Sequence, residues 1–398
     1  MKKILFVLLA SLVPLQCSSS PSLNKDPYQP AKAKQQNNSV VVGADQLDLL
    51  LPKLKGKKVS LVVNHTSQVG KIHLADTLKS CRVNIRKIFA PEHGFRGEAA
   101  NGEHVNDSVD HKTGITVVSL YGKNRKPTVK QLADVDVVIF DIQDVGARFY
   151  TYISTLHYVM EACAENGKHL IILDRPNPNG YVDGPVLQPE FKSFIGMHPI
   201  PIAHGLTVGE IALMINGEGW LEGAKKCSID VIPVKNWKHD DLYSIPVRPS
   251  PNLGNDQAIR LYPSICLFEG TVISLGRGTQ IPFLVLGNPE LKNLEFQFTP
   301  ISIKGMANNP PHENKVCYGM DLRSVAVARK VDLKYLLQFY TLYPDKEKFF
   351  IPFFDLLAGN ALLKQQIKEG LTEEQIRSSW KKDLDVYKAK RLKYLLYQ

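Results

Sequence analysis

Short apolar runs alternate with helical patterns through the first half of this chain, and this alternation restricts the fold more than any other feature. Five runs have the length and the apolar character of buried strands: residues 58–63, 84–90, 115–121, 136–141 and 169–174. Apolar residues at helical spacing predict helices over residues 44–56, 74–81 and 150–167, the last closed by Gly167. Strands of this kind, separated by helices, predict a parallel sheet covered on both faces.

The second half is less regular, and from about residue 320 it becomes helical and basic. Residues 228–234 resemble a strand. Two helix starts carry a capping box, in which a Thr is followed three positions later by Glu or Gln: Thr207/Glu210 and Thr372/Gln375. A chain of 398 residues has room for two domains. We expect an α/β protein with a Rossmann-like parallel-sheet domain at residues 41–284 and a smaller α+β domain at residues 285–398.

Polar residues follow directly on four of the predicted strands. The segments are Asn64-His65-Thr66-Ser67, Glu92-His93-Gly94-Phe95-Arg96, the stretch from Asp141 through Asp144 to Arg148, and Asp174-Arg175-Pro176-Asn177. Ligands of open parallel sheets bind at the carboxyl ends of the strands. These segments are richer in reactive groups than turns require, and they predict a shared cleft at that edge.

Several common uses of such a sheet are excluded by missing motifs. No GxGxxG follows the first strand and no GxxxxGK occurs, so dinucleotide and P-loop phosphate sites are not predicted. No GxSxG nucleophile elbow is present either.

The N-terminal segment is typical of a secretory signal. Residues 1–17 contain Lys2 and Lys3, a short apolar stretch and then Cys17, which would carry lipid if the segment is of the lipoprotein type. Residues 18–40 are rich in Ser, Pro, Lys, Gln and Asn, and we expect a disordered tether. These features predict an exported protein, either periplasmic or an outer-membrane lipoprotein, that meets a membrane only through Cys17.

The charge pattern and the cysteine spacing argue against a nucleic-acid partner, a disulfide framework and a cysteine metal site. The net charge is +10, but the lysines are scattered and form no basic stripe with interleaved aromatics, so no nucleic-acid partner is predicted. The five cysteines beyond Cys17 are widely spaced and form neither a disulfide framework nor a CxxC metal site.

The clustered residue types suit the hydrolysis of a glycosidic bond. That reaction needs two carboxyl groups, one held protonated and one ionised. Glu92 follows the apolar run Phe89-Ala90-Pro91, which would favour its protonated form, and the candidates for the second carboxylate are Asp141, Asp144 and Glu269. The candidate sugar-binding residues are Asn64, His93, Arg96, Arg148, Tyr150, Asp174 and Asn177. Arg277 lies between two glycines, where its guanidinium could bind a carboxylate of the ligand.

Two other readings compete with this one. A metal-dependent hydrolase could use His65, His93, Asp141 and Asp144, although no HExxH or similarly close spacing is present. A non-catalytic binding lipoprotein could present the same cleft to a cell-wall polymer or peptide.

Six long motifs, in order, resemble one family. They are NHTSQVG, FAPEHGFRGEAANGE, DVVIFDIQDVGARFYTYISTL, ILDRPNPNGYVDGPVL, PIAHGLTVGEIALMIN and LYPSICLFEGTVISLGRGTQIPF. Together they are similar to the NamZ-type exo-β-N-acetylmuramidases, also called the YbbC family, from about residue 40 to the C-terminal RLKYLLY.

The resemblance implies a Rossmann-like catalytic domain, a smaller C-terminal domain that completes the cleft, and no cofactor or metal. It implies removal of N-acetylmuramic acid from the non-reducing end of peptidoglycan fragments. On the matching positions, Glu92 would be the leading catalytic carboxylate and Glu269 its counterpart, with Asp141 and Asp144 competing for that second role. Arg277 would suit the lactyl carboxylate of the sugar.

Overall fold

A computed structural model describes residues 39–96, 107–122 and 124–398, and residues 40–398 form one compact unit. The predicted signal segment, with Cys17, and all but the end of the predicted tether lie outside the described residues. None of the helices in the described ranges is both long enough and apolar enough to cross a membrane.

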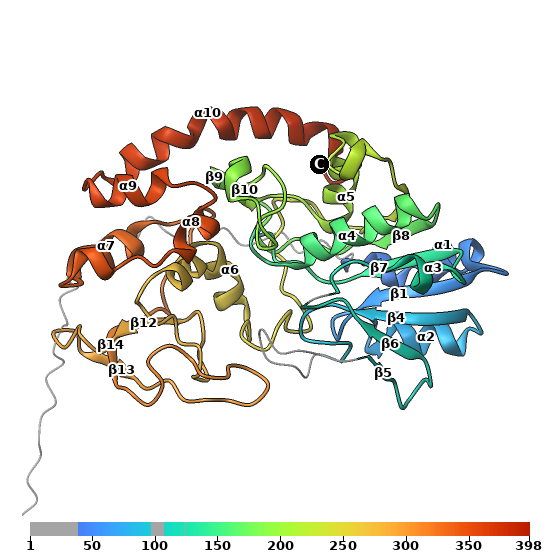
Figure 1. Cartoon of the computed structure of the whole chain (residues 1–398), viewed down its shortest axis with the longest axis horizontal. Helices are drawn as coiled ribbons and strands as arrows, with labels where there is room; N and C mark the ends of the chain where they lie inside the picture. The colour runs from blue at the N-terminus through green and yellow to red at the C-terminus, as the bar shows by residue number, and fades with distance from the viewer. Residues whose placement is uncertain (1–38, 97–106, 123) are drawn as a thin grey trace, which may run out of the picture. The chain divides into compact units, whose positions relative to one another are not determined.

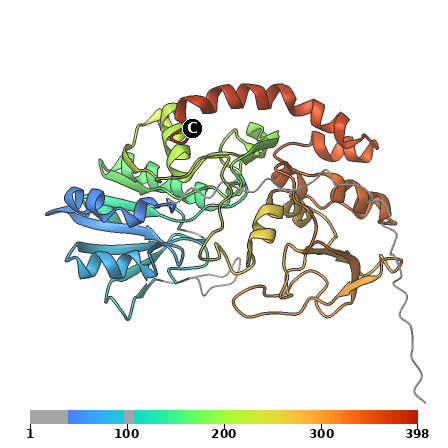
Figure 2. The same ribbon diagram turned by 180° about the vertical axis from the view of Figure 1, so that it is seen from behind.

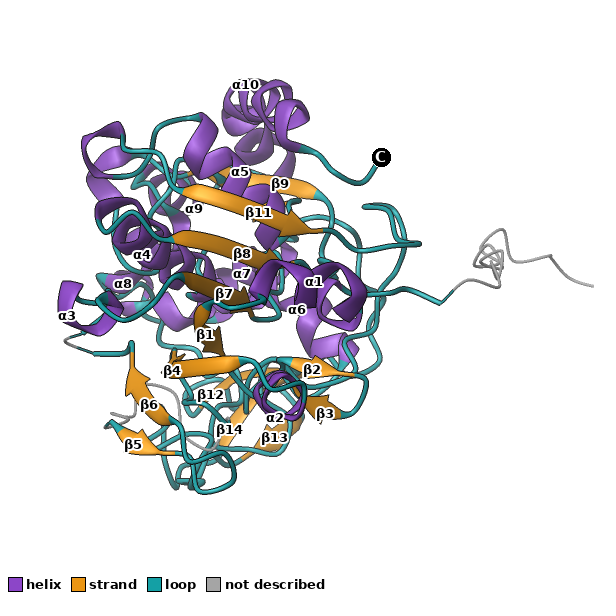
Figure 3. Cartoon of the chain, turned by 90° about the vertical axis from the view of Figure 1, so that its right-hand side faces the viewer, coloured by secondary structure: helices purple, strands orange, loops and turns teal. Residues whose placement is uncertain are grey.

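The predicted parallel sheet is present (Figure 3). Its seven strands lie in the order β11-β8-β7-β1-β4-β6-β5, and every neighbouring pair is parallel except β5 and β6. Counted along the chain, the six parallel strands follow the doubly wound order of Rossmann-like folds. The bounds are β1 Lys58–Val63, β4 Asn84–Ala90, β5 Ser108–Val109, β6 Thr116–Ser119, β7 Val137–Asp141, β8 His169–Leu173 and β11 Ser228–Ile232.

Both faces of this sheet are buried, as the apolar runs predict. In β1, Leu61 and Val63 join the core under α1 and α2, whereas Val62 joins the core under α4 and α5. Successive side chains of a strand point to opposite faces, so a strand covered on both sides is apolar at most of its positions. The helices are α1 Leu47–Leu54, α2 Leu74–Ser80, α3 Val129–Leu132, α4 Tyr152–Glu165 and α5 Val208–Gly217.

The C-terminal part is smaller and combines helices with an antiparallel sheet, as expected. This second sheet has the order β12-β14-β13 and is separate from the parallel one (Figures 1 and 2). Its strands are β12 Val285–Asn288, β13 Phe296–Phe298 and β14 Cys317–Asp321. The helices are α6 Asp256–Ile265, α7 Lys334–Leu342, α8 Phe353–Ala358, α9 Leu362–Lys368 and α10 Glu373–Arg391.

Helix α10 returns from this part to the sheet region (Figure 1). It packs against β9 Val182–Val186, which pairs antiparallel with β10 Pro201–His204. The Tyr397 hydroxyl, beyond α10, donates to the Asp174 carboxylate at the end of β8 (2.6 Å). The division at residues 284/285 remains a prediction.

Most predicted elements are present, with shorter bounds. The helix predicted over 150–167 is Tyr152–Glu165, and Gly167 follows it at a φ of 59°. Both predicted capping boxes are formed, at Thr207 and Thr372. The β9–β10 hairpin was not predicted because Gly184 and Pro185 interrupt its apolar pattern. The two-residue strands β2 Gln68–Val69 and β3 Ile72–His73 are too short to show any periodicity.

Arg148 joins the two parts from a fully buried position in the loop between β7 and α4. Its guanidinium donates to the carbonyls of Pro185 (2.8 Å), Ile200 (2.9 Å), Leu357 (2.8 Å) and Ala358 (2.8 Å). Burial lowers the pKa of this group to about 9. The last two carbonyls end α8, where the helix dipole favours a cation.

We expect Arg148→Met to lower the free energy of unfolding by at least about 3 kcal/mol, because four buried carbonyls lose their donor. Urea denaturation measures this. The matched control is Arg323→Met, whose side chain is about half exposed, and it should change stability by less than about 0.5 kcal/mol. A loss below about 1 kcal/mol for Arg148→Met would contradict the structural role.

Asp174 gives a pH-dependent prediction. It is fully buried, and desolvation raises its pKa from 3.8 to about 6 despite hydrogen bonds from Thr207, Tyr397 and Gly209. The folded state therefore holds this proton more tightly than the unfolded state. Through this group, acidification from pH 7 to pH 4 should stabilise the folded state by on the order of 3 kcal/mol.

Asp174→Asn cannot titrate and should lose this gain. Relative to wild type, its free energy of unfolding should fall by on the order of 3 kcal/mol more at pH 4 than at pH 7. Chemical denaturation at a series of pH values measures the difference, and the exposed Asp48→Asn on α1 is the control. If the difference in free energy of unfolding between wild type and Asp174→Asn did not vary with pH, the raised pKa of Asp174 would be ruled out.

Candidate active site

A cavity of about 450 Å³ lies where the carboxyl ends of β4 and β6 meet the start of α4 and the helices of the C-terminal part. Its wall is rich in aromatic rings and holds two carboxylates and two guanidinium groups. The lining residues are Glu92, His93, Tyr121, Arg125, Phe149, Tyr150, Thr151, Tyr152, Ser193, Phe194, Ile195, Ser250, Asn252, Leu253, Tyr262, Cys266, Glu269, Arg277, Phe283, Phe353, Leu356 and Leu357.

Glu92 enters this cavity from the turn that follows β4. Its Oε2 accepts a hydrogen bond from the Thr151 hydroxyl (2.9 Å), and the Tyr121 hydroxyl also donates to its carboxylate. Burial and the nearby carboxylate raise the pKa of Tyr121, so this hydroxyl keeps its proton. The sequence predicted apolar surroundings for Glu92, but these two partners are hydroxyls, which hold the carboxylate in one orientation.

His93, the next residue, has an unusual backbone. It is buried, and its φ is 70°, followed by Gly94 at 75°. A non-glycine residue in the left-handed region stores on the order of 1–3 kcal/mol, and such strain clusters at functional sites. This turn bends the chain sharply as it leaves β4, directly beside Glu92.

Glu269 and Arg277 form an ion pair in the cavity wall. Arg277 Nε lies 2.6 Å and Nη2 2.5 Å from the same oxygen, Glu269 Oε1. Gly276 and Gly278, on either side of Arg277, have φ values of 85° and 81°, so the loop needs glycine at both positions. The carboxylate raises the pKa of Arg277 against the effect of burial. Glu269 therefore faces the cavity with a permanent cation on one oxygen.

Tyrosines form the inner wall. The Tyr150 ring meets those of Tyr152 and Tyr262 edge to face, at centroid distances of 4.9 and 5.7 Å. The Tyr150 hydroxyl donates to the Pro249 carbonyl (2.8 Å). Burial raises the pKa of all three hydroxyls, so they remain neutral. Flat apolar surfaces with a few fixed polar groups suit a sugar ring.

The structure thus brings five of the predicted site residues together at one cavity: Glu92, His93, Tyr150, Glu269 and Arg277. The other seven do not line it. They are Asn64, Arg96, Asp141, Asp144, Arg148, Asp174 and Asn177.

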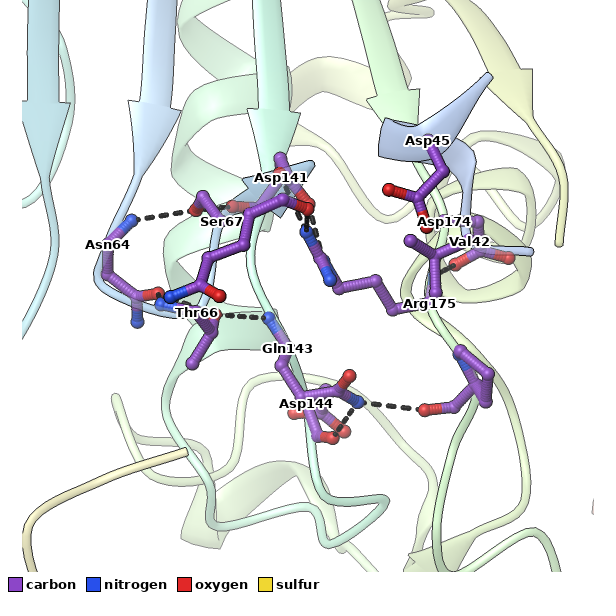
Figure 4. A network of polar contacts seen from close by, with 12 residues as sticks. Val42, Asp45, Asn64, Thr66, Ser67, Asp141, Gln143, Asp144, Asp174 and Arg175 are labelled. Carbon is purple, nitrogen blue, oxygen red and sulfur yellow. Dashed lines mark hydrogen bonds and ion pairs between the residues drawn. The ribbon is translucent and has the colours of Figure 1, made fainter. Parts of the chain in front are cut away.

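Three of those seven belong to a buried polar network between the ends of β1 and β7 (Figure 4). Asp141 pairs with Arg175 through two contacts of 2.6 and 3.0 Å. The Asn64 side-chain carbonyl accepts from Thr66, and Asp144 accepts from the Gly146 amide (2.6 Å). All three are buried, which indicates structural roles.

The remaining four also have partners within the fold. Arg96 binds Asp110 through two bonds of 3.0 Å. The Asn177 side chain donates to the Leu206 carbonyl (3.0 Å), and Arg148 and Asp174 are buried in the contacts described above. Sequence alone could not separate Asp141 and Asp174 from Glu92, because all three lie at or just after the end of a strand.

The predicted metal ligands His65, His93, Asp141 and Asp144 do not form a cluster. Among the described residues, the one group of three or more potential ligands within metal-binding distance of each other is Glu161, Glu165 and Glu222, and Lys126 already binds the first two. Asp141 is held by Arg175, and His65 contacts the Arg248 carbonyl.

Other cavity residues were missed. Tyr121 ends a predicted strand and Thr151 adjoins Tyr150, so their positions alone could have suggested them. Arg125 lies in the loop between β6 and α3, and Phe353 and Leu357 come from α8. No local pattern marks these three, because tertiary packing brings them to the cavity.

Comparison with known proteins agrees with this architecture. Residues 59–257 match the family model described as exo-beta-N-acetylmuramidase NamZ, N-terminal, and residues 260–397 match its C-terminal counterpart. The chain is 37% identical to the peptidoglycan beta-N-acetylmuramidase NamZ of Bacillus subtilis, and the match covers all of both chains.

Two crystal structures of DUF1343 family proteins from Bacteroides fragilis share the fold. The first has a TM-score of 0.85 and 46% identity, and the match covers 91% of this chain and 99% of that one. The second has a TM-score of 0.74 and 31% identity, covering 90% of this chain and 99% of that one. With both family models matched in order and a full-length relative at this identity, the chain belongs to the NamZ exo-β-N-acetylmuramidase family.

Proposed function

We propose that this protein is an exo-acting glycosidase that releases N-acetylmuramic acid from the non-reducing end of peptidoglycan fragments. The observation that carries this proposal is the placement of Glu92 and Glu269 on the wall of one aromatic cavity. Glycosidases need such a pair of carboxyl groups beside the scissile bond. Family membership supplies the substrate class.

In the proposed mechanism, Glu92 donates a proton to the glycosidic oxygen as the bond from that oxygen to the anomeric carbon breaks. A water molecule supplies the hydroxyl that bonds to the anomeric carbon and gives its other proton to a carboxylate of the cavity. Thr151 and Tyr121 hold its carboxylate in place, so the proton is transferred in a defined direction. Glu269, ion-paired with Arg277, faces the positive charge that develops on the sugar in the transition state. The tyrosine wall packs against the sugar ring.

The N-terminal segment suggests where this reaction takes place. A secretory signal, with or without lipid on Cys17, would bring the enzyme to the compartment that contains the cell wall. We therefore propose an exported enzyme.

The direct test compares a chromogenic β-N-acetylmuramide with the matching β-N-acetylglucosaminide, each with and without EDTA. Release from the muramide alone, unaffected by EDTA, is the expected result. Loss of activity in EDTA would favour a metal-dependent hydrolase. No release from the muramide or from a longer glycan would favour a binding protein.

Glu92→Gln is expected to lower kcat on the muramide by about 10³-fold or more while leaving the fold intact, since it removes the proton donor and little volume. Steady-state kinetics and a thermal melt measure the two effects. Glu190→Gln is the matched control because Glu190 is exposed and does not line the cavity. Wild-type turnover by the Glu92 variant would refute the assignment.

Glu269 and Arg277 should act as a unit. Each single change to Gln leaves one charged partner behind in a partly buried wall, so the two losses in kcat/KM should not add. We expect a coupling energy of about 1–3 kcal/mol from the double-mutant cycle. The exposed pair Lys381 and Asp385 is the control cycle. Additive losses at the first pair would show that its members act separately.

A further inference from the structure

The cavity contains two guanidinium groups, and their environments differ. Arg277 already has a carboxylate partner, since its Nε and Nη2 both bind Glu269 Oε1. A ligand carboxylate at Arg277 would have to compete with Glu269 at contacts of 2.5 to 2.6 Å. This pairing argues against the expectation that Arg277 binds the lactyl carboxylate of the substrate.

Arg125 is differently placed. Its Cζ lies 4.1 Å from the centroid of the Phe194 ring, so the guanidinium is held over an aromatic face. No ion pair links it to any carboxylate among the residues that the structure describes. Its Nε is buried and has no hydrogen-bond partner. Buried donors without partners are rare in native proteins, so this one requires an explanation.

The stacked arrangement suits anion recognition. A guanidinium that rests on a ring uses its face for that contact, and its N–H groups remain in the plane, where they match the geometry of a carboxylate. Arg125 lines the same cavity as Glu92 and Tyr121, the tyrosine that binds Glu92. An anion at Arg125 would therefore be located near the catalytic carboxylate.

The charges on the cavity wall also favour the binding of an anion at Arg125. Glu269 and Arg277 form an ion pair with each other, so neither carries an uncompensated charge. Arg125 is the remaining cation among the described lining residues. An acidic substrate would thus meet an unneutralised positive charge only at this position of the described wall.

We propose that Arg125 is the specificity-determining residue that binds the lactyl carboxylate of the terminal N-acetylmuramic acid. This inference rests on the proposed function. N-acetylmuramic acid differs from N-acetylglucosamine by this lactyl ether alone, so the residue that binds the carboxylate separates the two sugars.

The test uses the full chain and two substrates, the chromogenic β-N-acetylmuramide and its lactyl amide, a neutral analogue of nearly the same shape. In Arg125→Gln, the ratio of kcat/KM for the acid to kcat/KM for the amide should fall by about 10- to 100-fold, the range expected for a charge-assisted hydrogen bond. In Arg125→Lys, which keeps the positive charge but not the two parallel N–H groups of the guanidinium, this ratio should fall by less. In Arg277→Gln, kcat/KM should change by the same factor for the acid and for the amide, so their ratio should stay as in the wild type.

Calorimetric binding of free N-acetylmuramic acid and its lactyl amide gives a readout that does not depend on turnover. Arg125→Gln should lose affinity for the acid by the same factor, with a thermal melt confirming that the variant is folded. The inference would be overturned if the acid-to-amide ratio of kcat/KM were unchanged in Arg125→Gln, or if that ratio fell in Arg277→Gln instead. A wild-type protein that binds both sugars but hydrolyses neither would refute the proposed function and leave the role of Arg125 to the binding data.

Discussion

The buried guanidinium of Arg148 is the interaction on which the rest of the structure depends. It has no carboxylate partner among the described residues. Its two terminal nitrogens donate to four backbone carbonyls, two from the β9–β10 region and two from the end of α8. Gly359, just after α8, has a φ of 78°, and a Cβ there would lie 2.6 Å from Arg148 Nη2. The sheet region and the C-terminal helices are therefore joined at a point where the α8 side has no room for a side chain at Gly359. Since α8 also lines the cavity, the same contact helps to shape the site.

The second feature is the position of the cavity. In doubly wound sheets, the crevice at the topological switch point usually receives the ligand, and here that point lies between β1 and β7. Asn64, Asp141 and Arg175 occupy it with a hydrogen-bonded network (Figure 4). The usual crevice is thus filled by the protein's own side chains. The cavity lies instead at the ends of β4 and β6, where C-terminal elements complete its wall.

The sequence predicted much of the fold and part of the site, and the difference has a physical reason. β1 and β7 are apolar at nearly every position because both faces are buried, so local pattern was enough to find them. Asp141 and Glu92 both follow such strands, yet one is locked in a buried ion pair and the other faces the cavity. Which of them is exposed depends on loops far away in the sequence. Arg125 could not be found from the sequence for the same reason, since its stacking partner Phe194 is distant along the chain.

The contact between Tyr397 and Asp174 has a consequence for how the protein folds. The two residues are 223 positions apart, and the Tyr397 hydroxyl fills a bonding position on a carboxylate at the core of the parallel sheet. The loop entropy of bringing them together must be lost before the bond can compensate for it. Until the end of the chain arrives, the sheet contains a buried acid with one donor missing. This contact therefore couples the stability of the parallel sheet to that of the segment that carries Tyr397, although the two are far apart in the sequence.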